Sequence, residues 1–288
     1  MNKSTEKIDE ISPLFPGGFI DIHAHFFPER MFSAVWEFFE RNNWPIYYKD
    51  NPDALAGMLR GFGARRFTVL NYLHKPGLRD FLARWTMIFA EKHPEAIPFG
   101  TLYPGEPGNL QAARLWFDEW NFLGIKIQPL VTRFPIPEPS MYPIFDLMRE
   151  RGKWLIVHAG TAPYPNEYTN LGELDKLLTD FPGMNTILAH MGGFEFEKAL
   201  EMLDKYPNLH LDTTMIFVQT NVFDSTYPIP YERLLKYQDR ILFGSDFPNI
   251  PYPFTESVGG LLRTGLGDEF FNKVFFENAK RIFNLQDD

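Results

Sequence analysis

The chain has 288 residues, no cysteine, and a formal net charge of −9 from 28 basic and 37 acidic residues. Without cysteine it can form no disulfide framework, iron–sulfur cluster or thiolate zinc site, so any metal must be held by histidines and carboxylates. The acidic excess argues against a nucleic-acid-binding surface. No apolar run approaches the roughly 20 residues of a membrane span, and residues 1–17 carry no apolar signal-peptide region. We therefore expect a soluble, cytoplasmic protein that binds neither nucleic acid nor membranes.

Eight short apolar runs rich in β-branched residues predict eight β-strands. They begin near Phe19, Phe67, Ile97, Leu123, Trp154, Asn185, Leu209 and Arg240. Helical patterns lie between them: apolar residues recur at helical spacing in 171–183 and 193–208, and Ser140 is placed to cap a helix that stops at Gly152. This alternation predicts a closed (β/α)₈ TIM barrel as one domain over 18–288, after an N-terminal tail at 1–17.

The longest connection follows the first predicted strand. Residues 28–63 carry Trp44, Tyr47 and Tyr48 in the stretch WPIYY. In TIM barrels the loops after the strands surround the active site, and a lid is commonly such an insertion. We therefore expect residues 28–63 to form a lid over the barrel mouth.

Ionisable residues lie at the ends of five predicted strands. His23 and His25 are two residues apart, so both side chains point to the same side of the first strand. The later strands end near four more such residues, Lys126, His158, His190 and Asp246. Barrel closure places the first strand beside the eighth, which brings His23 and His25 near Asp246. All six side chains are expected at the mouth of the barrel.

This cluster has the residue types of a catalytic metal site. Neutral imidazoles and one carboxylate suit Zn²⁺, Mn²⁺ or Fe²⁺, and a catalytic site keeps one coordination position open for water. The metal lowers the pKa of that water toward about 7, which makes hydroxide available at neutral pH. An isolated His-x-His pair is weak support, but six ionisable residues at five strand ends form a much stronger signal.

The motifs DIHAHF, GIKIQP, IVHAG, ILAHMGG and LFGSDFP, closed by ENAKRIFNL, occur in order from about Gly18 to Leu285. In this the chain resembles the amidohydrolase-related (amidohydrolase 2) family of the amidohydrolase superfamily. That family contains aminocarboxymuconate-semialdehyde and resorcylate decarboxylases as well as metal-dependent hydrolases. The resemblance implies one divalent metal, with zinc preferred over manganese or iron, and a homodimer. The implied metal ligands are His23, His25, His158 and Asp246.

Two further residues have more than one reading. His190 matches a histidine that contacts the substrate or the activated water in the family, and it could instead bind a second metal. Lys126 matches a position where some relatives carry a carboxylated lysine that bridges two metals. An ion pair of Lys126 with Asp21, Asp212 or Asp246 would explain a buried lysine equally well. Asp246 itself could serve only as a helix N-cap.

The function predicted first is a metal-dependent hydrolase that attacks an ester, lactone or amide. Asp246 would accept the proton of the water, and His190 would polarise the carbonyl. The alternative is a metal-dependent, non-oxidative decarboxylase of an aromatic or unsaturated acid. Aromatic residues near the mouth suggest an apolar or aromatic small molecule; the candidate substrate-binding residues are His74, Tyr103, Arg133 and Tyr164. His93, in the charged stretch EKHPE, is expected on the surface.

Overall fold

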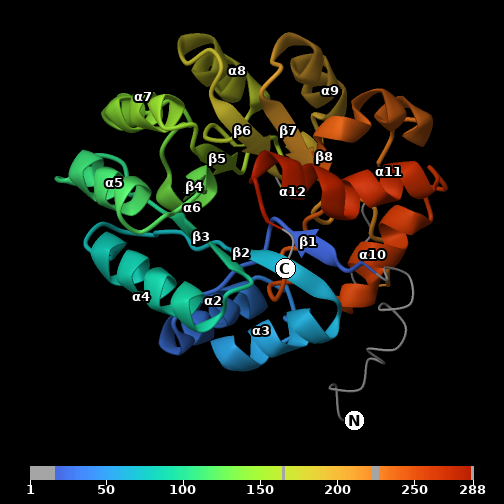
Figure 1. The fold of residues 1–288 in the computed structure, drawn as a ribbon, viewed down its shortest axis with the longest axis horizontal. Helices are drawn as coiled ribbons and strands as arrows, with labels where there is room; N and C mark the ends of the chain where they lie inside the picture. The colour runs from blue at the N-terminus through green and yellow to red at the C-terminus, as the bar shows by residue number, and fades with distance from the viewer. Residues whose placement is uncertain (1–16, 164–165, 222–226, 287–288) are drawn as a thin grey trace. The chain divides into compact units, whose positions relative to one another are not determined.

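The computed structural model describes residues 17–163, 166–221 and 227–286. Within them, eight strands follow one another in a single sheet, in the order of the chain (Figure 1). The strands are β1 (Phe19–Asp21), β2 (Ala64–Val69), β3 (Ala96–Gly100), β4 (Gly124–Ile127), β5 (Trp154–Val157), β6 (Asn185–Leu188), β7 (Leu209–Asp212) and β8 (Ile241–Leu242). This strand order, with helices between the strands, is that of a TIM barrel and confirms the predicted fold class.

The helices that separate the strands are short. They are α2 (Glu29–Arg41), α3 (Pro52–Gly61), α4 (Arg79–Lys92), α5 (Asn109–Asp118), α6 (Pro129–Thr132), α7 (Tyr142–Glu150), α8 (Leu171–Asp180), α9 (Phe196–Lys205), α10 (Phe254–Leu262), α11 (Asp268–Asn272) and α12 (Asn278–Ile282). The remaining helical segments are the 3₁₀ segments η2 (Pro139–Met141), η3 (Ala189–Gly192) and η4 (Tyr231–Arg240) and the π-helical η5 (Lys273–Glu277). In the part of the chain that the structure describes, none of these helices has the length and apolar composition needed to span a bilayer.

The chain divides into two compact units, one with residues 1–68 and 213–288 and the other with residues 69–212. In the first unit, β1 pairs in parallel with β2. The backbone N–H of Ile22 donates to the carbonyl of Phe243 at 3.0 Å, and the N–H of Asp246 donates to the carbonyl of His23 at 2.8 Å. The chain after β1 therefore lies beside the chain after β8, as barrel closure requires.

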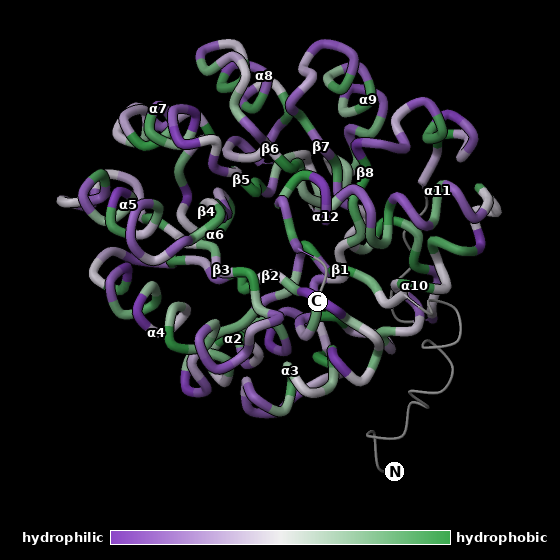
Figure 2. The backbone as a smooth tube through the Cα atoms, viewed as in Figure 1, coloured by the Kyte–Doolittle hydropathy of each residue, from purple (hydrophilic) through white to green (hydrophobic). Residues whose placement is uncertain are grey.

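In the second unit, β3 to β7 pair in parallel, each strand with the next. Figure 1 shows α5, α7, α8 and α9 on the outer side of these strands. Figure 2 shows hydrophilic and hydrophobic segments alternating along α7, α8 and α9, as expected for helices with one buried face. The α8 helix illustrates the local cause: the Asn170 side chain accepts from the N–H of Glu173 as N-cap, and four leucines of the helix are buried.

Three local expectations are corrected. The η2 turn is capped by Glu138, whose carboxylate accepts from the N–H of Ser140, so Ser140 is not the cap. The last strand stops at Leu242, because the N–H groups of the next three residues donate to Val274 and to the side chains of Thr213 and Asp21. His93 is buried, because its ring packs 4.4 Å from the ring of Phe89 and its Nδ1 lies 3.6 Å from Glu95.

Residues 28–63 form α2, α3 and the loop between them. This segment contacts the chain just after Asp246: the indole N–H groups of Trp36 and Trp44 donate to the side chain and the carbonyl of Asn249, at 3.2 and 2.8 Å. The Tyr48 hydroxyl accepts from the N–H of Phe254 at 2.7 Å. The segment is thus attached to the loop that follows one predicted metal ligand, and its role as a lid stays a prediction.

Candidate metal centre

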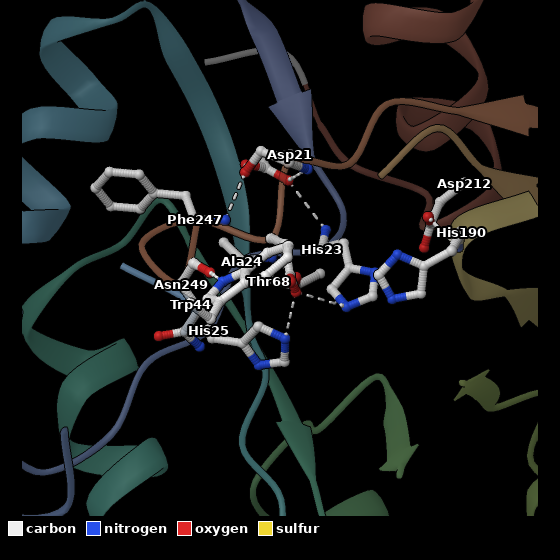
Figure 3. Close-up of polar contacts among 12 residues, drawn as sticks. Asp21, His23, Ala24, His25, Trp44, Thr68, His190, Asp212, Phe247 and Asn249 are labelled. Atoms are coloured by element: carbon white, nitrogen blue, oxygen red, sulfur yellow. Dashed lines mark hydrogen bonds and ion pairs between the residues drawn. The ribbon is translucent and has the colours of Figure 1, made fainter. Parts of the chain in front are cut away.

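His23, His25 and Asp246 form one compact group in the first unit. The Nε2 atoms of His23 and His25 lie 3.4 and 2.8 Å from Oδ1 of Asp246 (Figure 3). One ligand atom from each residue lies within 4.8 Å of the other two. Both histidines are almost fully buried, and the Asp246 side chain is 15% exposed. The structure thus brings together three of the four predicted ligands.

The backbone N–H groups of His23, Ala24 and His25 are all hydrogen-bonded. The N–H of His23 donates to Oδ1 of Asp21 at 3.0 Å, and the N–H of Ala24 donates to Oγ1 of Thr68 at 3.2 Å. The N–H of His25 donates to the carbonyl of Phe247 at 2.7 Å. Because buried N–H groups need partners, these bonds fix the direction in which both imidazoles leave the chain.

Asp246 adopts a left-handed backbone conformation, with φ 68°. Such a conformation is uncommon outside glycine, although aspartate tolerates it better than most residues. It is held on both sides, because the N–H of Asp246 bonds to His23 and its carbonyl accepts from the N–H of Asn249 at 2.9 Å. In this turn the carboxylate lies toward the two histidines.

The donor set fits a divalent metal ion. Two imidazole nitrogens and one carboxylate oxygen are ligands that Zn²⁺, Mn²⁺ and Fe²⁺ all accept. Three protein ligands are also the number that leaves coordination positions for a substrate or water. The sequence-based reading of Asp246 as a helix N-cap alone does not account for its contacts with two histidine nitrogens.

His158 and His190 lie together in the second unit. Their ring centroids are 4.8 Å apart with the rings nearly perpendicular. His158 follows β5, with its Nε2 3.3 Å from the carbonyl of Ala162. His190 lies in η3 after β6, and its backbone N–H donates to Oδ1 of the buried Asp212 at 2.9 Å (Figure 3). A ligand role for His158 and a substrate role for His190 stay predictions from the resemblance.

The loops that carry this pair pack backbone to backbone. His190 and Met191 both have left-handed φ angles, 54° and 48°. A Cβ at Gly160 would lie 2.3 Å from the carbonyl oxygen of Gly192. The N–H of Ala162 also donates to the carbonyl of Gly193 at 3.2 Å. Glycine is therefore required at 160, both for its φ of +104° and for this close approach.

Lys126 is 1% exposed on β4, so its side chain is buried as predicted. Its carboxylation and its role as a metal bridge stay predictions. Of the other candidate residues, His74 and Arg133 are exposed, while the half-buried Tyr103 ring packs 5.5 Å from that of Phe134. Tyr164 lies outside the described residues. Exposure of His74 reflects the end of β2 at Val69, five residues earlier than the apolar run suggested.

The main site feature that sequence reasoning missed is a network formed by Asp21 and Ser245. The sequence indicates Asp21 only as an ion-pair partner of Lys126, which stays a prediction; in the structure Asp21 accepts from the backbone N–H groups of His23 and Ser245. A signal was present, because Asp21, His23 and His25 alternate and so share one side of the strand. Asn249 accepts hydrogen bonds from two tryptophans. No sequence pattern indicates this role, because both tryptophans are more than 200 positions away.

The chain is similar to known proteins in sequence and in fold. It is 36% identical to the 6-methylsalicylic acid decarboxylase of Penicillium expansum over 104 residues, which are 31% of this chain and 32% of that protein. The similarity thus spans about a third of the relative.

Solved structures match nearly the whole chain. An uncharacterised TIM-barrel protein from Bordetella bronchiseptica has a TM-score of 0.74 at 17% identity, covering 92% of this chain and 98% of its own. A dihydroxybenzoic acid decarboxylase from Polaromonas sp. JS666, solved with bound manganese and the inhibitor 2-nitroresorcinol, has a TM-score of 0.66 at 16% identity. It covers 93% of this chain and 97% of its own. At these identities the matches support the fold.

The sequence profile described as amidohydrolase matches residues 20–285, from β1 to the residues after α12. The matched region includes all three members of the His-His-Asp group. Because the chain has the strand order of a TIM barrel, the His-His-Asp group and a family profile that covers nearly its whole length, the protein is an enzyme that belongs to the amidohydrolase family.

Proposed function

We propose that this enzyme is a metal-dependent, non-oxidative decarboxylase of a hydroxylated aromatic carboxylic acid. The observation that carries the proposal is the 36% identity with a 6-methylsalicylic acid decarboxylase, combined with the His-His-Asp group. The similarity to a decarboxylase favours the decarboxylase over the hydrolase. The sequence analysis favours the hydrolase, and the residue that supports it there is Lys126. A lysine at that position is a weak discriminator, since a buried ion pair is an equally good explanation for it.

The metal would be held by His23, His25 and Asp246, with His158 as the predicted fourth ligand. When bound, a divalent ion supplies a Lewis acid that orients and polarises the oxygens of the substrate. Zinc remains the metal expected first from the family resemblance, while the ligand types admit manganese and iron as alternatives. Elemental analysis of the purified protein distinguishes them.

Decarboxylation requires one proton at the ring carbon that carries the carboxylate. In the proposed reaction, the carboxyl group of Asp246 delivers this proton to the carbon. The bond between the ring and the carboxylate then breaks, its electron pair restores the aromatic ring, and CO₂ leaves. The partial exposure of Asp246 allows a proton from water to restore its carboxyl group. His190 is assigned a hydrogen bond to a substrate oxygen.

The direct test uses metal-loaded protein and 6-methylsalicylic acid in D₂O. We expect CO₂ and 3-methylphenol in equal amounts, with one deuterium at the carbon that lost the carboxylate. The same assay with His25→Ala, which lacks one ligand, controls for spontaneous decarboxylation. A panel of hydroxybenzoic acids then defines the position of the hydroxyl group.

Hydrolysis is the outcome that would replace this proposal. If aryl esters or lactones are cleaved while every hydroxybenzoic acid stays intact, the enzyme is a hydrolase. Two metal ions per chain, together with a mass of Lys126 that shows added CO₂, would support the same conclusion. The predicted homodimer is tested separately by light scattering of the purified protein.

A further inference from the structure

Asp21 is a fully buried carboxylate with no assigned part in the reaction. It lies at the last position of β1, and its Oδ1 accepts from two backbone N–H groups, those of His23 at 3.0 Å and of Ser245 at 3.2 Å. Its Oδ2 accepts from the Ser245 hydroxyl. Three donors thus converge on one buried side chain, as a desolvated carboxylate requires.

These bonds join the two segments that carry the metal-binding group. His23 is the residue next but one to Asp21, and Ser245 directly precedes Asp246. The Ser245 Oγ also accepts from the N–H of Phe247 at 2.9 Å, so the network reaches both neighbours of Asp246. Residues 21 and 245 are 224 positions apart in the sequence. The Asp21 carboxylate therefore bridges the segment with the two histidines and the segment with Asp246, in addition to the direct backbone bonds between these segments.

We infer that Asp21 is a positioning residue of the metal centre, which holds the His23 and Asp246 backbones in register through Ser245. The inference rests on the metal site of the proposed function and deepens it. Asp21 would not contact the ion. Its effect would come from the backbone positions of the ligands, and groups that orient ligands in this way commonly change metal affinity by about 10–100-fold.

The experiment compares variants that remove different numbers of hydrogen bonds from the network of Asp21 and Ser245. Asp21→Asn keeps an oxygen for the two N–H groups but loses the charge and one hydrogen bond to Ser245. Asp21→Ala removes every acceptor, and Ser245→Ala removes the hydroxyl alone. The matched control is Asn278→Ala: Asn278 is also fully buried, and its Nδ2 donates to the carbonyls of Gln238 and Ile241 at 2.7 and 2.8 Å. Its contact with β8 is at Ile241, at the start of the strand.

Three measurements are made on each variant: the Zn²⁺ and Mn²⁺ dissociation constants by chelator competition, the visible absorption spectrum of the Co²⁺ form, and the Tm of the metal-free protein. We expect Asp21→Ala to bind metal about 10–100-fold more weakly, with Asp21→Asn and Ser245→Ala in between. The Co²⁺ spectrum should change in these variants and not in Asn278→Ala. The loss of metal affinity in the Asp21→Asn/Ser245→Ala double variant should be less than the sum of the two single losses, because both residues act in one network.

If Asp21→Ala does not fold, Asp21→Asn and Ser245→Ala provide the test. The inference is overturned if these variants lower Tm as Asn278→Ala does but keep the wild-type metal affinity within twofold and the wild-type Co²⁺ spectrum. Asp21 would then be a structural residue of the core. If the wild-type protein itself binds no metal, the proposed metal centre fails together with this inference. If only the inference on Asp21 fails, the wild-type protein still binds metal and the substrate assay on it still decides between decarboxylation and hydrolysis, so the two failures are distinguished.

Discussion

The two histidine clusters of the molecule are held in different ways. In the first unit, the N–H groups of residues 22–25 are all hydrogen-bonded, and the buried Asp21 accepts hydrogen bonds from both segments that carry the group. In the second unit, His158 and His190 lie on two loops in contact through glycine backbones, and His190 is itself left-handed.

The difference indicates different tasks. Side chains that share an ion must keep their distances fixed, and a hydrogen-bonded strand end with a buried carboxylate supplies that rigidity. Residues that contact a substrate need correct placement. A loop with a strained backbone can provide that placement where contacts with its surroundings hold the strained conformation. We therefore expect the first cluster to dominate metal binding and His190 to act mainly on turnover.

The largest expected effect comes from removing a ligand of the first cluster. His25→Ala should weaken metal binding by more than about 100-fold, because even a residue outside the coordination shell costs up to that factor. Turnover should fall to background. Metal analysis after dialysis and the D₂O assay measure the two effects. His210→Asn, at the start of β7, serves as the control and should retain its metal. Full metal content in His25→Ala would remove His25 from the ligand set.

The next effect concerns His190. His190→Asn should leave the metal content nearly unchanged while turnover falls about 10²–10⁴-fold, the usual range for a lost acid–base or oxyanion contact. Metal content and steady-state kinetics are measured on the same preparation. Loss of metal together with activity would instead make His190 a ligand and favour a two-metal site with Lys126. Unchanged turnover would leave His190 with a structural role only.

Backbone packing in the second cluster is tested by a pair of glycine variants. Gly160→Ala introduces both an unfavourable φ and a clash with the Gly192 carbonyl, whereas Gly183→Ala has a φ of +81° and no atom within 4 Å. We expect Gly183→Ala to cost about 1 kcal/mol of unfolding free energy and Gly160→Ala at least twice that. Chemical denaturation measures both. Equal losses would show that the two loops adjust to the added methyl group.

The smallest effect belongs to the predicted lid. Trp44→Phe keeps an aromatic ring but loses the hydrogen bond to the Asn249 carbonyl, which should cost about 1 kcal/mol. If residues 28–63 act as a lid, KM should rise severalfold with little change in metal affinity. Trp85→Phe, on α4 in the second unit, is the control. A change in stability without any change in KM would make the segment a structural part of the barrel.

Several features follow from local sequence patterns. The barrel was predictable because eight apolar runs alternate with helical periodicity, and the shared direction of His23 and His25 follows from their spacing on a strand. The proximity of Asp246 to both histidines was predictable only through the closure rule of the barrel. The early end of β8 was not predictable from the sequence, because the apolar run extends through Phe243. The hydrogen-bond partners that end the strand lie on other segments.

By itself, the sequence determined the order of strands and helices and the residue types of the metal centre, since both depend on neighbours a few positions apart. Only the tertiary structure decided that Asp21 bonds to Ser245, that residues 28–63 attach to Asn249, and that His93 is buried. The physical reason is that a buried polar side chain takes whichever donors the fold brings within reach. Those donors lie up to 224 positions away, beyond the range of any periodic pattern.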